Sequence, residues 1–258
     1  RLLEGLGITE RSTGAEIHAT METVLLGTSE TGAEAHLDRI AADCAGIIVF
    51  GRVKTHPENT EGIACGLLKM ATVGLGKQIG AQSAHTHGLW ESVRAVPRLT
   101  LATRKILCGV ALVENCYRQP VALEVVPGTW DAFHEADERL LRVSKEHFAR
   151  LPFEELDVLI VDEMGKNISG TGLDPNVIGA WRIKGGDRRP DYKRIAVLSL
   201  TPESQGNGLG VGLADFTTRR FQQSFDPAPP PPNPLTPTQP GLPHTLQAKA
   251  PPLPQNQP

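Results

Sequence analysis

The sequence has little of several features that mark whole classes of protein. Aromatic residues make up 5% of its 258 residues, and its apolar runs are far shorter than the roughly 18 residues that span a membrane. Neither charge dominates, because 29 acidic residues stand against 26 basic ones and the formal net charge is −3. We therefore expect no membrane partner and no nucleic-acid partner, since both select for basic surfaces.

The sequence also lacks a disulfide framework and a secretion signal. Its four cysteines, Cys44, Cys65, Cys108 and Cys116, form no C-x-x-C pair, and a chain of this size needs no disulfides. We expect free thiols in a cytoplasmic protein. The first residue is Arg1, and no charged segment followed by an apolar segment comes after it. The sequence is therefore expected to lack the beginning of its first lobe.

Proline is concentrated at one end. Of the 21 prolines, 13 fall within residues 227–258, beside a single charged residue, Lys249. Proline removes backbone donors, and this segment has few large apolar side chains, so its burial cannot offset the entropy cost of ordering. We predict an extended, disordered tail that serves as a linker or degenerate end, or as a docking segment for a proline-reading module.

Short apolar runs alternate with helical patterns in the rest of the chain. Apolar residues recur at helical spacing over 129–150, which predicts an amphipathic helix. The alternation is typical of an α/β fold with mixed or parallel sheets flanked by helices. We expect two lobes, at residues 1–150 and 151–226, with the active-site cleft between them. The predicted buried strands are 46–53, 106–113, 121–126, 156–161 and 195–200.

Residues 53–88 are the first candidate site. They hold three of the eight histidines, His56, His85 and His87, in a glycine-rich setting. Such a segment lets the backbone approach a ligand and offers imidazoles as bases or metal ligands. The spacing around Gly76-Lys77 fits neither a Walker A loop nor a dinucleotide fingerprint. In an extended conformation, His85-Thr86-His87 would present two imidazoles on one side of the chain, as metal ligands often are. The alternative is that residues 53–88 form a surface loop and a helix without a binding role.

A second glycine-rich segment follows a predicted strand. It covers residues 161–176, and residues 198–212 repeat the pattern. Because open α/β sheets bind ligands at the carboxyl ends of their strands, both segments are expected to line the cleft. Asp162 and Glu163 are either an acid/base pair or a solvated pair at a strand end.

Several long phrases occur in an order that is recognisable. Together they resemble the lactate racemase domain family, the homologues of the nickel-pincer lactate racemase, over about residues 7–226. The phrases are closer to another branch of that family than to the lactate enzyme itself. They are VKTHPENTEGIACGLLKMATVGLGKQIGAQSAH at 53–85, ALVEN at 111–115, LDVLIVDEMGKNISGTGLDPNVIG at 156–179 and GLADFTTRR at 212–220.

The resemblance implies a two-lobed α/β enzyme that binds a nickel-pincer nucleotide in its cleft. By position in the motif, Lys69 matches the lysine that tethers the cofactor covalently. His85 matches the nickel ligand, and nickel readily accepts imidazole. His56 matches one of the two histidines that exchange the hydroxyl proton of the substrate.

Four further residues are candidates for binding the cofactor or the substrate. Gly74, Gly76 and Lys77 are expected to contact the cofactor, with Lys77 serving alternatively as a charge near a helix end. Arg182 falls near the substrate-holding positions of the family, where it would bind a carboxylate through two hydrogen bonds. The second proton-transfer histidine of the family precedes the phrase that begins at Arg1, so this sequence lacks it.

These features predict a racemase or epimerase of a 2-hydroxy acid. It would work by hydride transfer to the tethered cofactor, with proton transfer by histidine. The alternative is a non-catalytic homologue that binds a ligand or metal, because one histidine is missing and proline follows Asp226 where the family continues as a folded segment. A third reading is an enzyme of another class whose glycine-rich loops bind a phosphorylated substrate.

Overall fold

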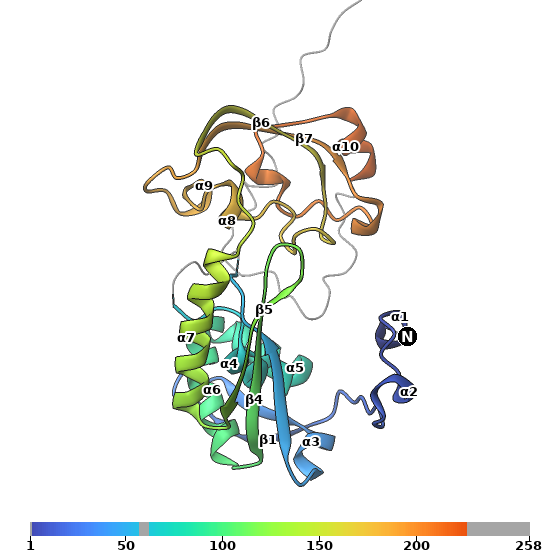
Figure 1. Ribbon diagram of the computed structural model, residues 1–258, viewed down its shortest axis with the longest axis vertical. Coiled ribbons are helices and arrows are strands. Elements are labelled where there is room, and N and C mark those ends of the chain that lie inside the picture. The colour runs from blue at the N-terminus through green and yellow to red at the C-terminus, as the bar shows by residue number, and fades with distance from the viewer. Residues whose placement is uncertain (1, 57–61, 226–258) are drawn as a thin grey trace, which may run out of the picture. The chain divides into compact units, whose positions relative to one another are not determined.

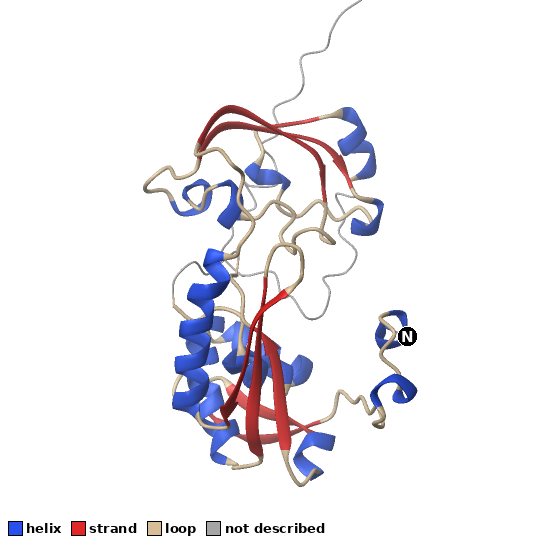
Figure 2. Cartoon of the chain, in the orientation of Figure 1, coloured by secondary structure: helices blue, strands red, loops and turns tan. Residues whose placement is uncertain are grey.

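The computed structural model describes residues 2–56 and 62–225 of the chain (Figures 1 and 2). Helices combine with antiparallel and parallel sheets, so the predicted α/β class is confirmed. The predicted tail at 227–258 lies outside the described residues. Within the described ranges, no helix has both the length and the apolar character that a membrane crossing requires.

Residue contacts divide the chain into two units, which are described separately. The sequence predicts one boundary near residue 150, whereas the contacts group residues 52–66 and 111–124 with the C-terminal half. Within unit 2, Asn176 Nδ2 donates a hydrogen bond of 3.4 Å to the carbonyl oxygen of His56. Unit 1 comprises residues 1–51, 67–110 and 125–135, and unit 2 comprises residues 52–66, 111–124 and those from 136 onward.

Unit 1 starts with short elements around an antiparallel strand pair. Strands β1 and β2 are paired in antiparallel register, with a bulge between Leu25 and Gly27. Ala33 and Ala35 of this hairpin pack against Val96 in a small core cluster. The elements are α1 (Leu2–Gly5), α2 (Glu10–Thr13), β1 (Thr23–Thr28), β2 (Glu34–Asp38) and α3 (Arg39–Asp43).

A three-stranded sheet follows, in the order β3-β4-β5 (Figure 1). Its strands are β3 (Ile47–Arg52), β4 (Ile106–Glu114) and β5 (Pro120–Pro127), close to the predicted ranges. The prediction that they are buried is wrong for one face, because Ile48 and Phe50 are 63% and 59% exposed. The alternate residues of β3, on the opposite face, are buried.

The helices of unit 1 supply the buried side of this sheet. Leu67 and Phe133 both pack against β4 at Gly109, where a Cβ atom would lie 2.7 Å from each side chain. Burying an aromatic side chain such as Phe133 contributes about 2 kcal/mol. The helical elements are α4 (Leu67–Lys69), the π-helix η1 (Met70–Gly74), α5 (Lys77–Thr86), α6 (Leu89–Ala102) and α7 (Trp130–Glu146). Helix α7 lies within the predicted 129–150, and its residues from 136 onward belong to unit 2.

Unit 2 is built on a parallel sheet in the order β6-β7-β8. Its strands are β6 (Glu155–Met164), β7 (Asp191–Leu200) and β8 (Phe216–Thr217). Tyr192, Ile195 and Phe221 lie in one core cluster with Met164 and Leu173. The remaining elements are α8 (Pro175–Ile178), α9 (Trp181–Lys184), the 3-10 turns η2 (Pro202–Ser204) and η3 (Val211–Leu213), and α10 (Arg219–Ser224).

Candidate functional site

Lys69 lies at a break in helical geometry in unit 1. It ends α4, and η1 follows directly, with the Leu75 N–H donating to the Met70 carbonyl oxygen at 2.9 Å in a π-type bond. Single π-turns within helices are frequent at functional sites. The Lys69 ammonium lies 5.2 Å from the ring centroid of Trp90, at the start of α6. An amine over an indole face is held by a cation–π interaction while its stem packs on apolar surface.

His85 lies on α5 and is half-buried. The expectation that His85-Thr86-His87 forms an extended pair of ligands is wrong, because His85 and Thr86 are helical and His87 caps the helix end. Residues two apart on a helix point to nearly opposite sides. The exposed His87 is instead held by its Nδ1 at 2.9 Å from the Ser83 carbonyl oxygen.

The glycine at position 76 allows α5 to approach η1. A Cβ atom there would lie 2.3 Å from the Thr72 carbonyl oxygen and 3.1 Å from Gly80 Cα. At position 74, by contrast, an added Cβ would meet only the flexible Met70 side chain, at 3.3 Å from Sδ. Gly76 therefore has a packing role, and the cofactor contacts predicted for Gly74 and Gly76 stay predictions.

Lys77 forms an ion pair within unit 1. Its Nζ lies 2.9 Å from Asp38 Oδ2, and Asp38 is 7% exposed. Burial alone would raise the pKa of Asp38, but hydrogen bonds from the Ala41 N–H and from Lys77 outweigh it, so the pKa is lowered from its usual 3.8. Because Asp38 also caps α3, the pair joins the end of β2 to the starts of α3 and α5. This contact matches the alternative reading of Lys77 as a charge near a helix end.

His56 belongs to unit 2, where two contacts fix its backbone. Lys54 and Cys65 form an antiparallel bridge with N–H to O distances of 3.1 and 3.2 Å, closing the segment that contains His56. Residues 57–61 of this segment lie outside the described residues. Asn176 Nδ2 reaches the His56 carbonyl oxygen and is itself held 3.0 Å from Asp174 Oδ1. The half-buried His56 therefore sits beside the second glycine-rich segment, as the sequence predicts for the candidate site.

The loops after β6 and β7 are joined at the carboxyl ends of these parallel strands. The buried Thr201 hydroxyl donates to Asn167 Oδ1 at 2.7 Å and lies 2.7 Å from the Ser204 hydroxyl. Ser204 Oγ in turn accepts from the Lys166 N–H at 3.0 Å. Both glycine-rich segments of unit 2 thus meet at the carboxyl ends of the strands, which is where open parallel sheets bind ligands.

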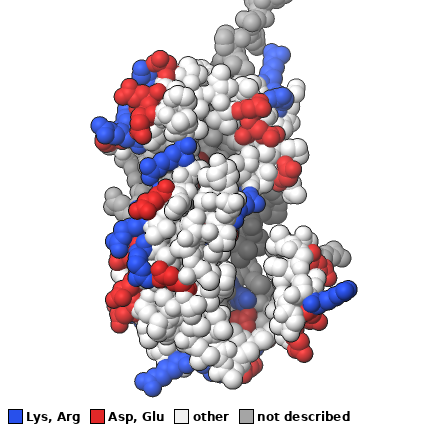
Figure 3. Space-filling view, viewed as in Figure 1, with Lys and Arg blue, Asp and Glu red and all other residues white. Residues whose placement is uncertain are grey.

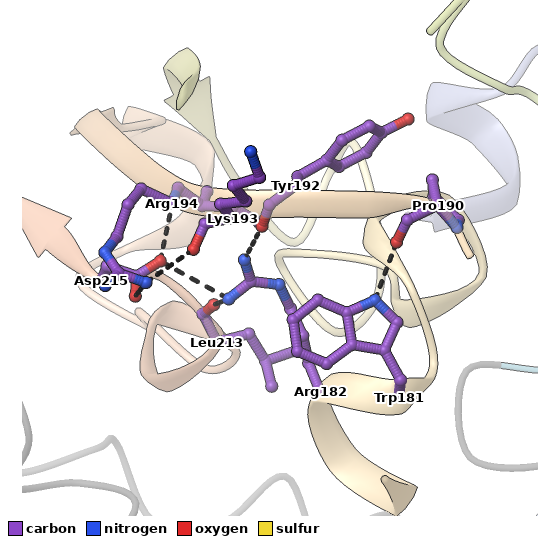
Figure 4. Close-up of polar contacts among 9 residues, drawn as sticks. Trp181, Arg182, Pro190, Tyr192, Lys193, Arg194, Leu213 and Asp215 are labelled. Carbon is purple, nitrogen blue, oxygen red and sulfur yellow. Dashed lines mark hydrogen bonds and ion pairs between the residues drawn. The ribbon is translucent and has the colours of Figure 1, made fainter. Parts of the chain in front are cut away.

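Arg182 is engaged by protein groups, as Figure 4 shows. Its guanidinium donates to the carbonyl oxygens of Tyr192 and Leu213, and it lies 3.5 Å from Asp215 Oδ2. The side chain is only 10% exposed. The arginine therefore links α9 to β7 and to the turn before β8, and its predicted role in holding a substrate carboxylate stays a prediction.

The acidic pair at the end of β6 is solvated. Asp162 and Glu163 are both exposed, and Asp162 lies 3.7 Å from Arg220. On the face drawn in Figure 3, acidic and basic side chains are interspersed instead of separating into patches of one sign. This exposure supports the reading of a strand-end pair over an acid/base pair.

The contacts sort the predicted residues into two groups. Lys69, Gly74, Gly76, Lys77 and His85 belong to unit 1, whereas His56 and Arg182 belong to unit 2.

Two residues beside the predicted ones were not identified from the sequence. Trp90, beside Lys69, follows the candidate segment by two residues, and its pairing with a lysine is a tertiary contact. Asn176, beside His56, stands in the second glycine-rich segment, where its polar side chain was a visible signal.

The side chains that could act as metal ligands limit which kind of metal or metal cofactor the site could bind. No cluster of three or more His, Cys, Asp or Glu side chains suited to a metal occurs in the part of the chain that the structure describes. A bare metal ion needs about three or four protein ligands. A group that brings its own donor atoms would need fewer protein ligands. Lys69, at the end of α4, and His85, on α5, are the residues that would hold such a group, the lysine as a covalent anchor and the histidine as a metal ligand.

Two comparisons with known proteins identify no relative of this chain. No family model matches the chain, and no curated protein matches it either.

Proposed function

We propose that the chain belongs to a racemase or epimerase of 2-hydroxy acids that carries a nickel-pincer nucleotide tethered to Lys69. The observation that carries the proposal is the arrangement of Lys69 and His85. Both belong to unit 1, on helical elements joined through η1, and a π-turn begins directly after the lysine. The order of sequence phrases that resembles the lactate racemase domain family supports the same assignment.

Each residue would have a defined task. The Lys69 amine would anchor the cofactor through an amide-type bond, and the Trp90 ring would orient the amine before that bond forms. The His85 imidazole would ligate nickel. When bound, the group supplies a hydride acceptor for the 2-carbon of the substrate. His56 would take the hydroxyl proton and return it, with its backbone held by Asn176.

The covalent anchor is the sharpest test. The full chain, produced together with the enzymes that make the cofactor, is expected to show an intact-mass increase that peptide mapping localises to Lys69. Lys69→Arg keeps a cation near Trp90 but cannot form the linkage, so the mass increase should disappear. Lys54→Arg is the matched control, because Lys54 is exposed and lies in the same sequence phrase. An unmodified Lys69 in protein from a competent host would reject the proposal.

Turnover separates the enzyme from a non-catalytic homologue. Single enantiomers of several 2-hydroxy acids, lactate among them, are incubated with the loaded full-length gene product and analysed by chiral chromatography. His56→Gln should lower turnover by at least a hundredfold and leave the mass increase intact. His18→Gln is the control, since His18 is exposed. A mass increase at Lys69 without turnover on any acid would identify a non-catalytic homologue that binds the cofactor. A phosphorylated metabolite bound to protein that lacks the mass increase would support an enzyme of another class, the third reading.

A further inference from the structure

A cavity of about 580 Å³ opens in unit 1 at the end of the sheet where β4 begins. It lies where α6 ends, β4 begins, β5 ends and α7 begins, and Figure 1 shows these ends gathered together. None of its lining residues takes part in the proposed racemase site. Its walls include the apolar side chains of Leu101, Ile106, Leu107 and Pro127 together with the Trp130 ring.

Two arginines give this apolar cavity a positive rim. Arg98 and Arg104 both line it and are both exposed. In the described part of the chain, neither guanidinium forms an ion pair with a carboxylate, and this includes Asp131, which adjoins Trp130 in sequence. Two positive charges without acidic partners beside apolar walls favour a ligand that combines an anion with an apolar body.

The Arg98 guanidinium is held in place by the fold. The Arg98 guanidinium carbon lies 3.7 Å from the ring centroid of Trp130, and Trp130 Nε1 donates to the Arg94 carbonyl oxygen at 2.9 Å. Preorganised guanidinium groups lose less entropy when they bind an anion.

Arg104 has a left-handed backbone, with φ 57°, just after the end of α6. Glycine or asparagine is usual at that place, so an arginine there costs about 1 kcal/mol.

From these contacts we infer a second binding site, which takes a small amphiphilic carboxylate. The carboxylate would receive hydrogen bonds from Arg98 and Arg104, and the aliphatic body would lie on Leu107, Pro127 and Trp130. Phosphate or acetate would gain no apolar contact, and a neutral alcohol would gain no ionic hydrogen bond. Binding should therefore require both parts of the ligand.

Isothermal titration of the full chain with octanoate tests the inference. Octanoate should bind saturably, at least tenfold more tightly than octanol, octylammonium or acetate. Arg98→Gln and Arg104→Asn should each weaken octanoate binding about tenfold, and asparagine suits the left-handed backbone at position 104. Arg142→Gln is the charge-matched control, because Arg142 is an exposed residue on α7. Circular dichroism and thermal unfolding establish that each variant is folded.

The position of the bound ligand is read from the indole N–H signals of the three tryptophans by nuclear magnetic resonance. Octanoate should shift the Trp130 signal, assigned with Trp130→Phe, and leave those of Trp90 and Trp181 unchanged. Equal binding of octanoate and octanol, or octanoate binding that neither arginine variant alters, would overturn the inference. So would a shift at Trp90 or Trp181 in place of Trp130.

Discussion

The two glycine-rich regions have similar compositions but different structures. In unit 1, residues 67–80 form helices and a π-turn, with Gly76 allowing close helix contact. In unit 2, the segments after β6 and β7 form interlocked loops, where a Cβ atom at Gly210 would lie 1.8 Å from the Thr171 carbonyl oxygen. Glycine thus permits close backbone approach in both regions, but the two close approaches differ in backbone conformation, because φ is −77° at Gly76 and 93° at Gly210.

The polar residues of the two regions differ in the same way. In unit 1, Lys77 at the start of α5 forms an ion pair with Asp38. In unit 2 neutral side chains share hydrogen bonds, with Thr201 at their centre. The first arrangement depends on pH and the second does not, so substitutions can separate them.

The largest effect is expected for Gly210→Ala. The added methyl group would collide with backbone and force an alanine to adopt φ 93°, so unfolding free energy should fall by about 3 kcal/mol or more. Gly186→Ala is the control, because its φ is 90° but nothing lies within 4 Å of the added Cβ. It should cost about 1 kcal/mol. If denaturant melts showed equal losses of stability for Gly210→Ala and Gly186→Ala, backbone strain alone would require glycine at position 210, and the contact between the loops would not.

Gly76→Ala should be nearly as harmful for a different reason. Its φ is ordinary, −77°, so the cost comes from the clash with the Thr72 carbonyl oxygen, and we expect a loss of about 2 kcal/mol. Gly74→Ala meets only the flexible Met70 side chain and should stay within about 0.5 kcal/mol of the parent. Thermal unfolding of both variants measures the difference. If Gly76→Ala left the stability unchanged, Gly76 would not be needed for packing.

Asp38→Asn should destabilise the protein in a way that depends on pH. Asparagine can still cap α3 but leaves Lys77 without its anion, so the loss at pH 7 should be about 2 kcal/mol. Because the pKa of Asp38 is lowered in the folded state, its contribution is complete above the usual 3.8 and is lost as pH falls through the lowered value. Urea melts should show the difference between parent and variant shrinking below pH 3.8. A difference that stays constant down to pH 2 would contradict this.

Thr201→Val should have the smallest effect. The substitution keeps the shape but removes the hydroxyl that contacts Asn167 and Ser204, so about 1 kcal/mol should be lost. The loss should be the same at pH 7 and pH 4, because no group in the network titrates in that range. Thr28→Val, at an exposed strand position, is the control and should be neutral. A pH-dependent loss would mean that a charged group takes part.

Strands and the long helix were predictable from the sequence because their signals are local. The apolar runs at 106–113 and 121–126 coincide with β4 and β5 to within two residues, and helical spacing located α7. The β1–β2 hairpin was not predicted, because its buried alanines carry little apolar signal and its burial depends on packing against α6.

The candidate site was predictable in part. Histidine and lysine clustering located Lys69 and His85, and the resemblance to a family assigned their roles. The engagement of Lys77 by Asp38 and of Arg182 by two carbonyl oxygens was not predictable, because every partner lies in another element.

Amino-acid order by itself determined where β3, β4, β5 and α7 lie to within a few residues, and which residue types stand in the glycine-rich segments. These properties depend on periodicity and backbone freedom over a few residues, which the chain carries locally. Only the tertiary structure decided which lysine is paired with an acid and which lies over an indole, and that Arg98 and Arg104 share one cavity. Charges and apolar surfaces act on neighbours in space, and folding brings those neighbours from distant parts of the chain.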